Sequence, residues 1–175
     1  ILITAAFYLF LITLRDFFHR KYRNLSQITA HFSFSILILS ILFNNIFSSE
    51  VITNLKINET YQAQNLKINF ESIEQENKQN FKAIRGKFIV EDQSGLIEVM
   101  QPELRIYNQP NIVTSEADIK TNIFTDKFMT MNYVQNQDYF NIRYQVKPFM
   151  IWIWISTILL CFSGCISLIR KKYEN

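Results

Sequence analysis

Apolar residues fall into three long runs, separated by a basic segment and by a middle region of mixed character. The run 149–169 contains no charged residue, whereas the run 28–47 carries several polar interruptions. The run 1–14 is shorter, about 21 Å long at a helical rise of about 1.5 Å per residue. Because a helix needs about 20 apolar residues to cross a bilayer core of about 30 Å, the pattern predicts two complete membrane spans and one partial span.

The predicted domain organisation follows from these runs. The chain begins at Ile1 inside an apolar run, so we expect the first span to be truncated. A signal peptide is the competing interpretation, but it needs a basic region before the apolar run, and here the basic residues follow it. The predicted segments are a truncated transmembrane helix at 1–14, a basic inner loop at 15–27, a transmembrane helix at 28–48, a β-rich outer domain at 49–147, a transmembrane helix at 148–169 and a basic inner tail at 170–175.

The middle region changes after Val51 to short runs in which apolar and polar residues alternate. A turn at 93–95 separates two such runs, which is typical of a β-hairpin whose loop contains glycine. Only 73–80 is compatible with a helical period. Short strands at regular spacing favour a small sandwich or barrel, so the predicted fold class is an integral membrane α-helical protein with an inserted all-β domain. The predicted strands, from a run of some eight, are 66–70, 81–92, 96–100, 104–107, 119–124, 128–134 and 140–146.

Basic residues flank the apolar runs and predict the orientation in the membrane. Positive charges concentrate on the cytoplasmic side of a bacterial inner membrane or the matrix side of the mitochondrial inner membrane. The domain 49–147 is therefore expected on the periplasmic or intermembrane-space side, and a bias toward Ile, Asn, Phe and Lys favours an organellar source. The net charge is only +3 and forms no basic stripe, which argues against a nucleic-acid partner. The clusters comprise Arg15, Arg20, Lys21 and Arg23 in the loop, and Arg170, Lys171 and Lys172 in the tail.

The middle region offers no self-contained catalytic chemistry. It contains neither histidine nor cysteine, and no glycine-rich phosphate loop. The cysteines Cys161 and Cys165 lie in the last apolar run, where their i, i+4 spacing puts them on one helix face. We interpret them as small apolar side chains, with a disulfide or metal site as the alternative. A solvated face or inter-strand ion pairs are the expected roles of Glu98, Glu103, Arg105 and Glu116.

The two histidines lie near the basic side of the predicted membrane. His19 belongs to the basic loop and is interpreted as an exposed interfacial residue. His31 lies a few residues inside an apolar span, where ionisable side chains are rare and mark function by default. A helix-end histidine that bonds a neighbour or a lipid headgroup is the alternative interpretation.

Polar residues occur on two sides of the helix that carries His31. Such a helix cannot face lipid on both sides, so we expect an interior helix packed against other spans. A neutral imidazole there is a competent axial ligand for haem iron. His19 is too far away to be the second ligand, which must then come from a segment outside this chain. At 100° per residue, one side holds Thr29, Ser33, Ser40 and Asn44, and the other holds His31, Ser35 and Asn45.

These residues, with later motifs in the same order, resemble the C-terminal third of the CcmF family, the cytochrome c-type haem lyase subunit of cytochrome c maturation system I. The motifs are Thr29-Ala30-His31, Arg85-Gly86, the segments 101–107, 114–119, 142–144 and 147–149, and Trp152-Ile153-Trp154. The resemblance implies covalent attachment of haem to apocytochrome c, with haem received from a membrane-anchored haem chaperone. It also implies that His31 is an axial ligand of a b-type haem, and that this haem keeps the substrate haem iron ferrous.

The chain also departs from the family pattern. Ser26 and Ser33 stand where the family usually has glycine on either side of the histidine. The tryptophan-rich segment and the histidines that grip substrate haem belong to upstream parts of the family, so we expect an upstream part of the same protein, or a split-gene partner, besides membrane lipid. The alternative function is a non-catalytic structural subunit of a mitochondrial inner-membrane respiratory complex, with respiratory-complex subunits as partners.

Overall fold

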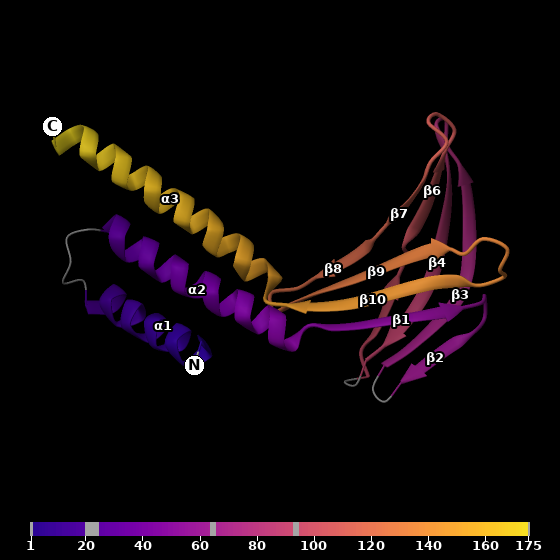
Figure 1. Cartoon of the computed structure of the whole chain (residues 1–175), viewed down its shortest axis with the longest axis horizontal. Helices are drawn as coiled ribbons and strands as arrows, with labels where there is room; N and C mark the ends of the chain where they lie inside the picture. Colours follow the sequence, from indigo (N-terminus) through magenta and orange to yellow (C-terminus); the bar gives the residue numbers. More distant parts are fainter. Residues whose placement is uncertain (1, 20–24, 64–65, 93–94, 175) are drawn as a thin grey trace. The chain divides into compact units, whose positions relative to one another are not determined.

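A computed structural model describes residues 2–19, 25–63, 66–92 and 95–174, which form two compact units (Figure 1). One unit is helical and comprises Ile1–Ser48, Asn122–Asp126 and Lys147–Asn175. The other unit is built from strands and comprises Ser49–Thr121 and Lys127–Val146. Apolar helices thus flank an all-β domain, as the sequence predicted.

The helical unit contains α1 (Leu2–His19), α2 (Leu25–Phe47) and α3 (Met150–Glu174), and α2 packs against both other helices. Among the described helices, α2 and the part Met150–Ile169 of α3 are long and apolar enough to cross a membrane. The helices extend beyond the predicted spans, because the predicted boundaries follow hydrophobicity whereas a helix ends where its backbone hydrogen bonds end. The predicted loop 15–27 therefore contains the end of α1 and the start of α2.

Small polar residues recur at every seventh position along both partners of the α2–α3 contact. Ser33 and Ser40 of α2 are buried, as are Ser156 and Ser163 of α3. A spacing of seven keeps these residues on one seam of two packed helices, and small side chains let the backbones approach closely. Ser26 extends this seam by a further seven residues. Ser26 and Ser33, at which the sequence was expected to depart from the family pattern, thus both belong to this seam.

The β unit is a sandwich of two sheets, in agreement with the predicted class. One sheet has the order β1-β10-β9-β8, and the other has the order β2-β3-β4-β6-β7 with β5 paired to β4. The strands are β1 (Ser49–Leu55), β2 (Thr60–Ala63), β3 (Leu66–Asn77), β4 (Phe81–Glu91), β5 (Ile97–Met100), β6 (Glu103–Tyr107), β7 (Val113–Glu116), β8 (Asp118–Thr121), β9 (Thr125–Tyr133) and β10 (Phe140–Pro148).

The strands that sequence analysis did not identify individually are β1, β2 and β7, and all three lie at sheet edges. An edge strand is covered less by its neighbours, so its alternation of apolar and polar residues is weaker. The helical interpretation of 73–80 was wrong, because β3 continues to Asn77 and pairs with β4 throughout. The register shifts between Phe70 and Ser72, and such a bulge interrupts the period of two on which strand prediction depends.

The core of the sandwich consists of inward-facing apolar side chains from both sheets. Phe70 and Phe88 stack with their ring centroids 4.3 Å apart, and both are fully buried. Met129 and Ile142 from the opposite sheet are also fully buried. The alternation seen in the sequence therefore marks the two inner faces of the sandwich.

Candidate functional site

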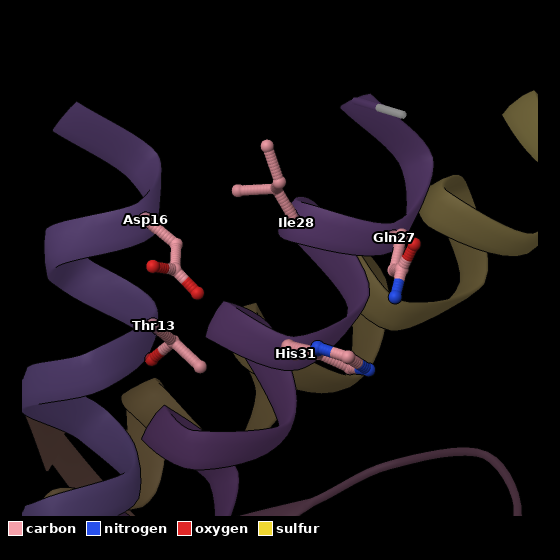
Figure 2. A pocket seen from close by; sticks show the side chains of 5 residues that line it. All are labelled: Thr13, Asp16, Gln27, Ile28 and His31. Carbon is pink, nitrogen blue, oxygen red and sulfur yellow. The ribbon is translucent and has the colours of Figure 1, made fainter. Parts of the chain in front are cut away.

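His31 lines a cavity of about 230 Å³ between α1 and α2, shown in Figure 2. The histidine lies about two turns into α2, and Gln27 lies one turn before it on the same side. Ile28 completes the α2 side of the cavity, and Thr13 and Asp16 line it from α1. The cavity is thus built from two helices of the same unit, at the end of α2 where the predicted basic side lies.

His31 is exposed, so the rest of the described chain leaves much of this residue uncovered. In Figure 2 the ring extends toward the side of Gln27 and away from Asp16. No hydrogen bond among residues of the described chain engages either ring nitrogen. An imidazole with an open nitrogen and open space beside it has what an axial metal ligand requires.

The α1 side of the cavity was not identified by sequence analysis. Thr13 is buried, its hydroxyl lies 3.1 Å from the hydroxyl of Ser35, and it also donates to main-chain carbonyls of its own helix. Asp16 lies three residues further along α1, on the same face. Its carboxylate forms an exposed ion pair with Arg15 at 3.4 Å. The i, i+3 spacing of Thr13 and Asp16 could have indicated that both lie on one helix face. The predicted span ended at residue 14, however, so Asp16 was not counted as part of a helix.

The two polar sides of α2 meet different surroundings. Ser33 and Ser40 are buried on the seam with α3, and Ser35 is buried against α1. His31, which the helical wheel grouped with Ser35, instead lines the cavity and is exposed. The helical wheel thus correctly separated the face of α2 with Ser33 and Ser40 from the face with Ser35. It did not show that His31 would be the polar residue left exposed.

The remaining candidates form no site within the described residues. The side chain of His19 lies outside the described part of the chain. Cys161 and Cys165 are both exposed free thiols on α3. Among the residues that the structure describes, no group of three histidine, cysteine or acidic side chains is arranged to hold a metal ion. A haem ligand, which needs only one imidazole from each side, is not subject to this requirement.

Ion pairs in the β unit link neighbouring strands, as the sequence indicated. Glu103 accepts a hydrogen bond from the Arg85 guanidinium at 2.9 Å and lies 3.3 Å from Arg105. The hydrogen bond from Arg85 lowers the pKa of the Glu103 carboxyl below its usual value. Glu98 pairs with Lys127 at 2.7 Å, and Arg105 lies 3.7 Å from Glu116. The pairs of Arg85 with Glu103 and of Arg105 with Glu116 join neighbouring strands of one sheet and support its register. The pair of Glu98 on β5 with Lys127 on β9 instead links the two sheets of the sandwich.

The fold defines a class of membrane protein in which a β-sandwich is inserted between two apolar helices, one of which carries an accessible histidine. The family model described as the CcmF C-terminal beta-sandwich matches residues 46–148. The chain therefore belongs to the CcmF family.

Similar proteins agree with this assignment. The cytochrome c-type biogenesis protein ccl1 of Rhodobacter capsulatus is 29% identical over 120 residues, which cover 69% of this chain and 18% of the relative. The cytochrome c-type biogenesis protein CcmF of Pseudomonas fluorescens is 24% identical over 83% of this chain and 22% of the relative. The corresponding protein of Haemophilus influenzae is 22% identical over 93% of this chain and 26% of its own length.

A solved structure shares the fold. It is the cytochrome c heme lyase CcmF, with a TM-score of 0.58 and 18% sequence identity over 79% of this chain and 23% of that chain. This chain thus spans about a fifth to a quarter of the length of the proteins that it matches.

Proposed function

We propose that this chain is the C-terminal part of a cytochrome c haem lyase and supports the covalent attachment of haem to apocytochrome c. The support is its membership of the CcmF family over 46–148, together with relatives named for cytochrome c-type biogenesis. The chemistry itself is assigned to other parts of the assembly, because this chain corresponds to only about a fifth to a quarter of the proteins that it matches. The contribution of this chain is to bind and to position.

Within this function, His31 is an axial ligand of a b-type haem in the membrane. The observation that carries this assignment is the accessible imidazole, which lines a cavity and has no hydrogen-bond partner among the described residues. The donor fits haem iron, because a histidine imidazole is an established axial ligand of haem. The second axial ligand belongs to another segment of the protein or to a partner chain.

Residues near His31 have supporting roles in this proposal. Ser33 and Ser40, packed on the seam with α3, fix the rotation of α2 and hence the direction of the imidazole. Gln27 and Thr13 supply polar groups at the edge of the cavity. When bound, the haem would supply a one-electron couple that keeps the iron of substrate haem ferrous.

The domain assignments and the location are part of the same proposal. The segment 49–147 is an outer domain in the periplasm or intermembrane space, where it docks apocytochrome c or a partner subunit. The basic segments face the cytoplasm or matrix, and the membrane is the bacterial or mitochondrial inner membrane. Haem reaches the assembly from a haem chaperone.

The test compares the two histidines of the chain. His31→Ala and His19→Ala are made in the full chain, co-expressed with the polypeptide that carries the other segments of the family, and the reduced absorption spectrum of each purified complex is recorded. We expect His31→Ala to abolish the low-spin b-type signal and His19→Ala to retain it. An unchanged spectrum in His31→Ala would refute the ligand assignment.

A second readout separates the ligand from the wider function. Covalent haem on a co-expressed cytochrome c is measured in the same strains by haem staining of denaturing gels. We expect the stain to fall in His31→Ala and to be restored in part by an added reductant, because this haem acts through the redox state of the iron. A complex without any haem signal in the unsubstituted protein would instead favour a non-catalytic structural subunit.

A further inference from the structure

The loop Asn122–Phe124 joins β8 to β9 and belongs to the helical unit rather than to the sandwich. Its two large side chains point outward, with 62% of Ile123 and 64% of Phe124 exposed. Two adjacent apolar side chains at a loop tip are unusual on a surface that faces water, where turns are polar. Surroundings other than water are therefore expected to cover Ile123 and Phe124.

Two hydrogen bonds tie the loop to the start of α3, one from Trp152 in its first turn and one from Phe149, the residue just before the helix. The indole Nε1–H of Trp152 donates to the carbonyl of Ile123 at 2.9 Å, and the main-chain N–H of Phe149 donates to the carbonyl of Phe124 at 2.7 Å. Phe149 holds a positive φ of 60°, a conformation that bulky residues rarely adopt. The position of the loop along the axis of α3 is therefore determined.

The length of α3 then sets the depth of the loop. The apolar segment Met150–Ile169 has 20 residues, which at about 1.5 Å per residue gives about 30 Å, the thickness of a bilayer core. The segment has about the length that spans the core, which puts Met150 near its boundary. Trp152 lies about 3 Å inside this boundary by the helical rise. The loop bonded to Trp152 is thus at the same level, with Ile123 and Phe124 in contact with the interfacial region.

The main chain of the loop is suited to such surroundings. The side-chain oxygen of Asn122 accepts hydrogen bonds from the N–H groups of Phe124 and Thr125, and the Asn122 N–H donates to the Thr125 carbonyl. With the two carbonyls bonded to α3, most polar groups of the loop are satisfied by protein. An element that leaves water must meet this condition, because lipid offers no replacement partners.

We propose that the loop Asn122–Phe124 is an interfacial membrane anchor. Its side chains Ile123 and Phe124 insert into the lipid at the membrane surface where α3 begins, near Met150. Trp154, which is 63% exposed on the same first turns of α3, contributes an aromatic ring of the type enriched at membrane interfaces. The anchor fixes the depth of α3 and prevents the β8–β9 connection from moving away from the membrane surface. It does not depend on haem or on the identity of the partner proteins.

The test measures lipid contact at the loop directly. The full chain is reconstituted into phosphatidylcholine vesicles, with an environment-sensitive fluorophore attached to a single cysteine at Phe124→Cys in a Cys161→Ala and Cys165→Ala background. Cysteine at this position preserves the loop, since both hydrogen bonds to α3 involve main-chain carbonyls. Quenching by lipids brominated on their acyl chains is compared with the same labelling at Ile97→Cys, a site of similar exposure (64%) on β5.

A positive control uses a native thiol. Cys161 lies about 16 Å along α3 from Met150, near the bilayer centre, and is labelled alone in the Cys165→Ala variant. We expect the probe at Phe124→Cys to show a blue-shifted emission and a loss of intensity with bromolipid, strongest for bromines near the headgroup. Iodide added to the aqueous phase serves as a second quencher. The fluorescence of the probe at Ile97→Cys should be quenched by iodide and not by bromolipid.

The possible outcomes separate the anchor from the membrane span itself. If Cys161 is quenched by bromolipid and Phe124→Cys behaves like Ile97→Cys, the anchor proposal is overturned. If Phe124→Cys is protected from both quenchers, a protein contact covers the loop and the proposal is also wrong. If Cys161 is not quenched, α3 does not cross the bilayer, and the depth argument fails with it.

Discussion

Ser26 and Ser163 exchange hydrogen bonds across the contact between α2 and α3. The hydroxyl of Ser26 donates to the carbonyl of Ser163 at 2.8 Å, and the hydroxyl of Ser163 donates to the carbonyl of Ser26 at 2.7 Å. Each side chain thus reaches the main chain of the opposite helix, which requires a close approach of the two backbones. The pair lies one heptad from Ser33 and Ser156, which are buried deeper on the same seam.

Ser163→Leu should destabilise the helical unit far more than Ser163→Ala. Alanine removes one interhelical hydrogen bond, which is worth about 0.6 kcal/mol in membrane proteins. Leucine cannot fit where the side chain is only 2% exposed and must separate the helices. Thermal unfolding in detergent measures the difference. Ser167→Leu on the exposed face of α3 is the matched control, and equal losses for Ser163→Leu and Ser167→Leu would contradict the proposed close packing.

Gly86→Ala should destabilise the β-sandwich. A methyl group at Gly86 would lie 2.6 Å from the ring of Phe88 and 2.9 Å from the sulfur of Met131, both fully buried. Overpacking of this kind costs about 1–3 kcal/mol. The lower midpoint should appear in denaturant unfolding followed by near-ultraviolet circular dichroism.

Gly164→Ala is the control for this substitution, because the added methyl group would meet no atom within 4 Å apart from the adjacent residues and the nearby backbone of its own helix. It should leave the stability of the sandwich unchanged, and alanine is the better helix former in α3. Unaltered stability in Gly86→Ala would show that Phe88 and Met131 move aside without cost. The absence of a side chain at Gly86 thus leaves room for Phe88 and Met131 in the core beneath β4.

The sequence predicted those features that depend on neighbours along the chain. The hairpin of β4 and β5 was identified from a glycine turn, and Gly95 indeed has a positive φ of 73° with its N–H bonded to Asp92. The apolar runs likewise identified α2 and α3. By contrast, the length of β3 beyond its bulge depends on pairing with β4, which no local pattern contains.

The candidate site divides in the same way. The placement of His31 early in an apolar helix was evident from the sequence, and so was the polar character of two helix faces. The approach of Thr13 and Asp16 to the same cavity was not, because it depends on how α1 packs against α2. The interfacial loop was missed for a related reason. Residues 119–124 read as one strand, but β8 ends at Thr121 where Asn122 begins to bond its own loop.

Glu103→Gln should reduce the stability of the β unit at neutral pH and flatten its acid dependence. The hydrogen bond from Arg85 lowers the pKa of Glu103 below its usual value of 4.5, so the folded state favours the carboxylate. The stabilisation is fully present above the usual pKa and is lost as the pH falls through the lowered one. Denaturant midpoints measured from pH 7 down to acid should fall more steeply for the unsubstituted chain than for Glu103→Gln. Parallel curves would contradict a stabilising role for this pair.

Trp152→Phe should loosen the interfacial loop without disturbing α3. The substitution keeps an aromatic ring at the membrane surface but removes the Nε1–H that donates to the Ile123 carbonyl. An unpaired carbonyl at the edge of a bilayer is unfavourable, so the loop should shift toward water to regain a partner. Bromolipid quenching of a probe at Phe124→Cys should therefore decrease in Trp152→Phe. Trp154→Phe makes the same chemical change on an exposed ring two residues away, where no hydrogen bond among the described residues joins the indole to the loop, and should reduce the quenching less than Trp152→Phe does. Equal responses to the two substitutions would mean that bulk aromatic character at this level, rather than the hydrogen bond, holds the loop in place.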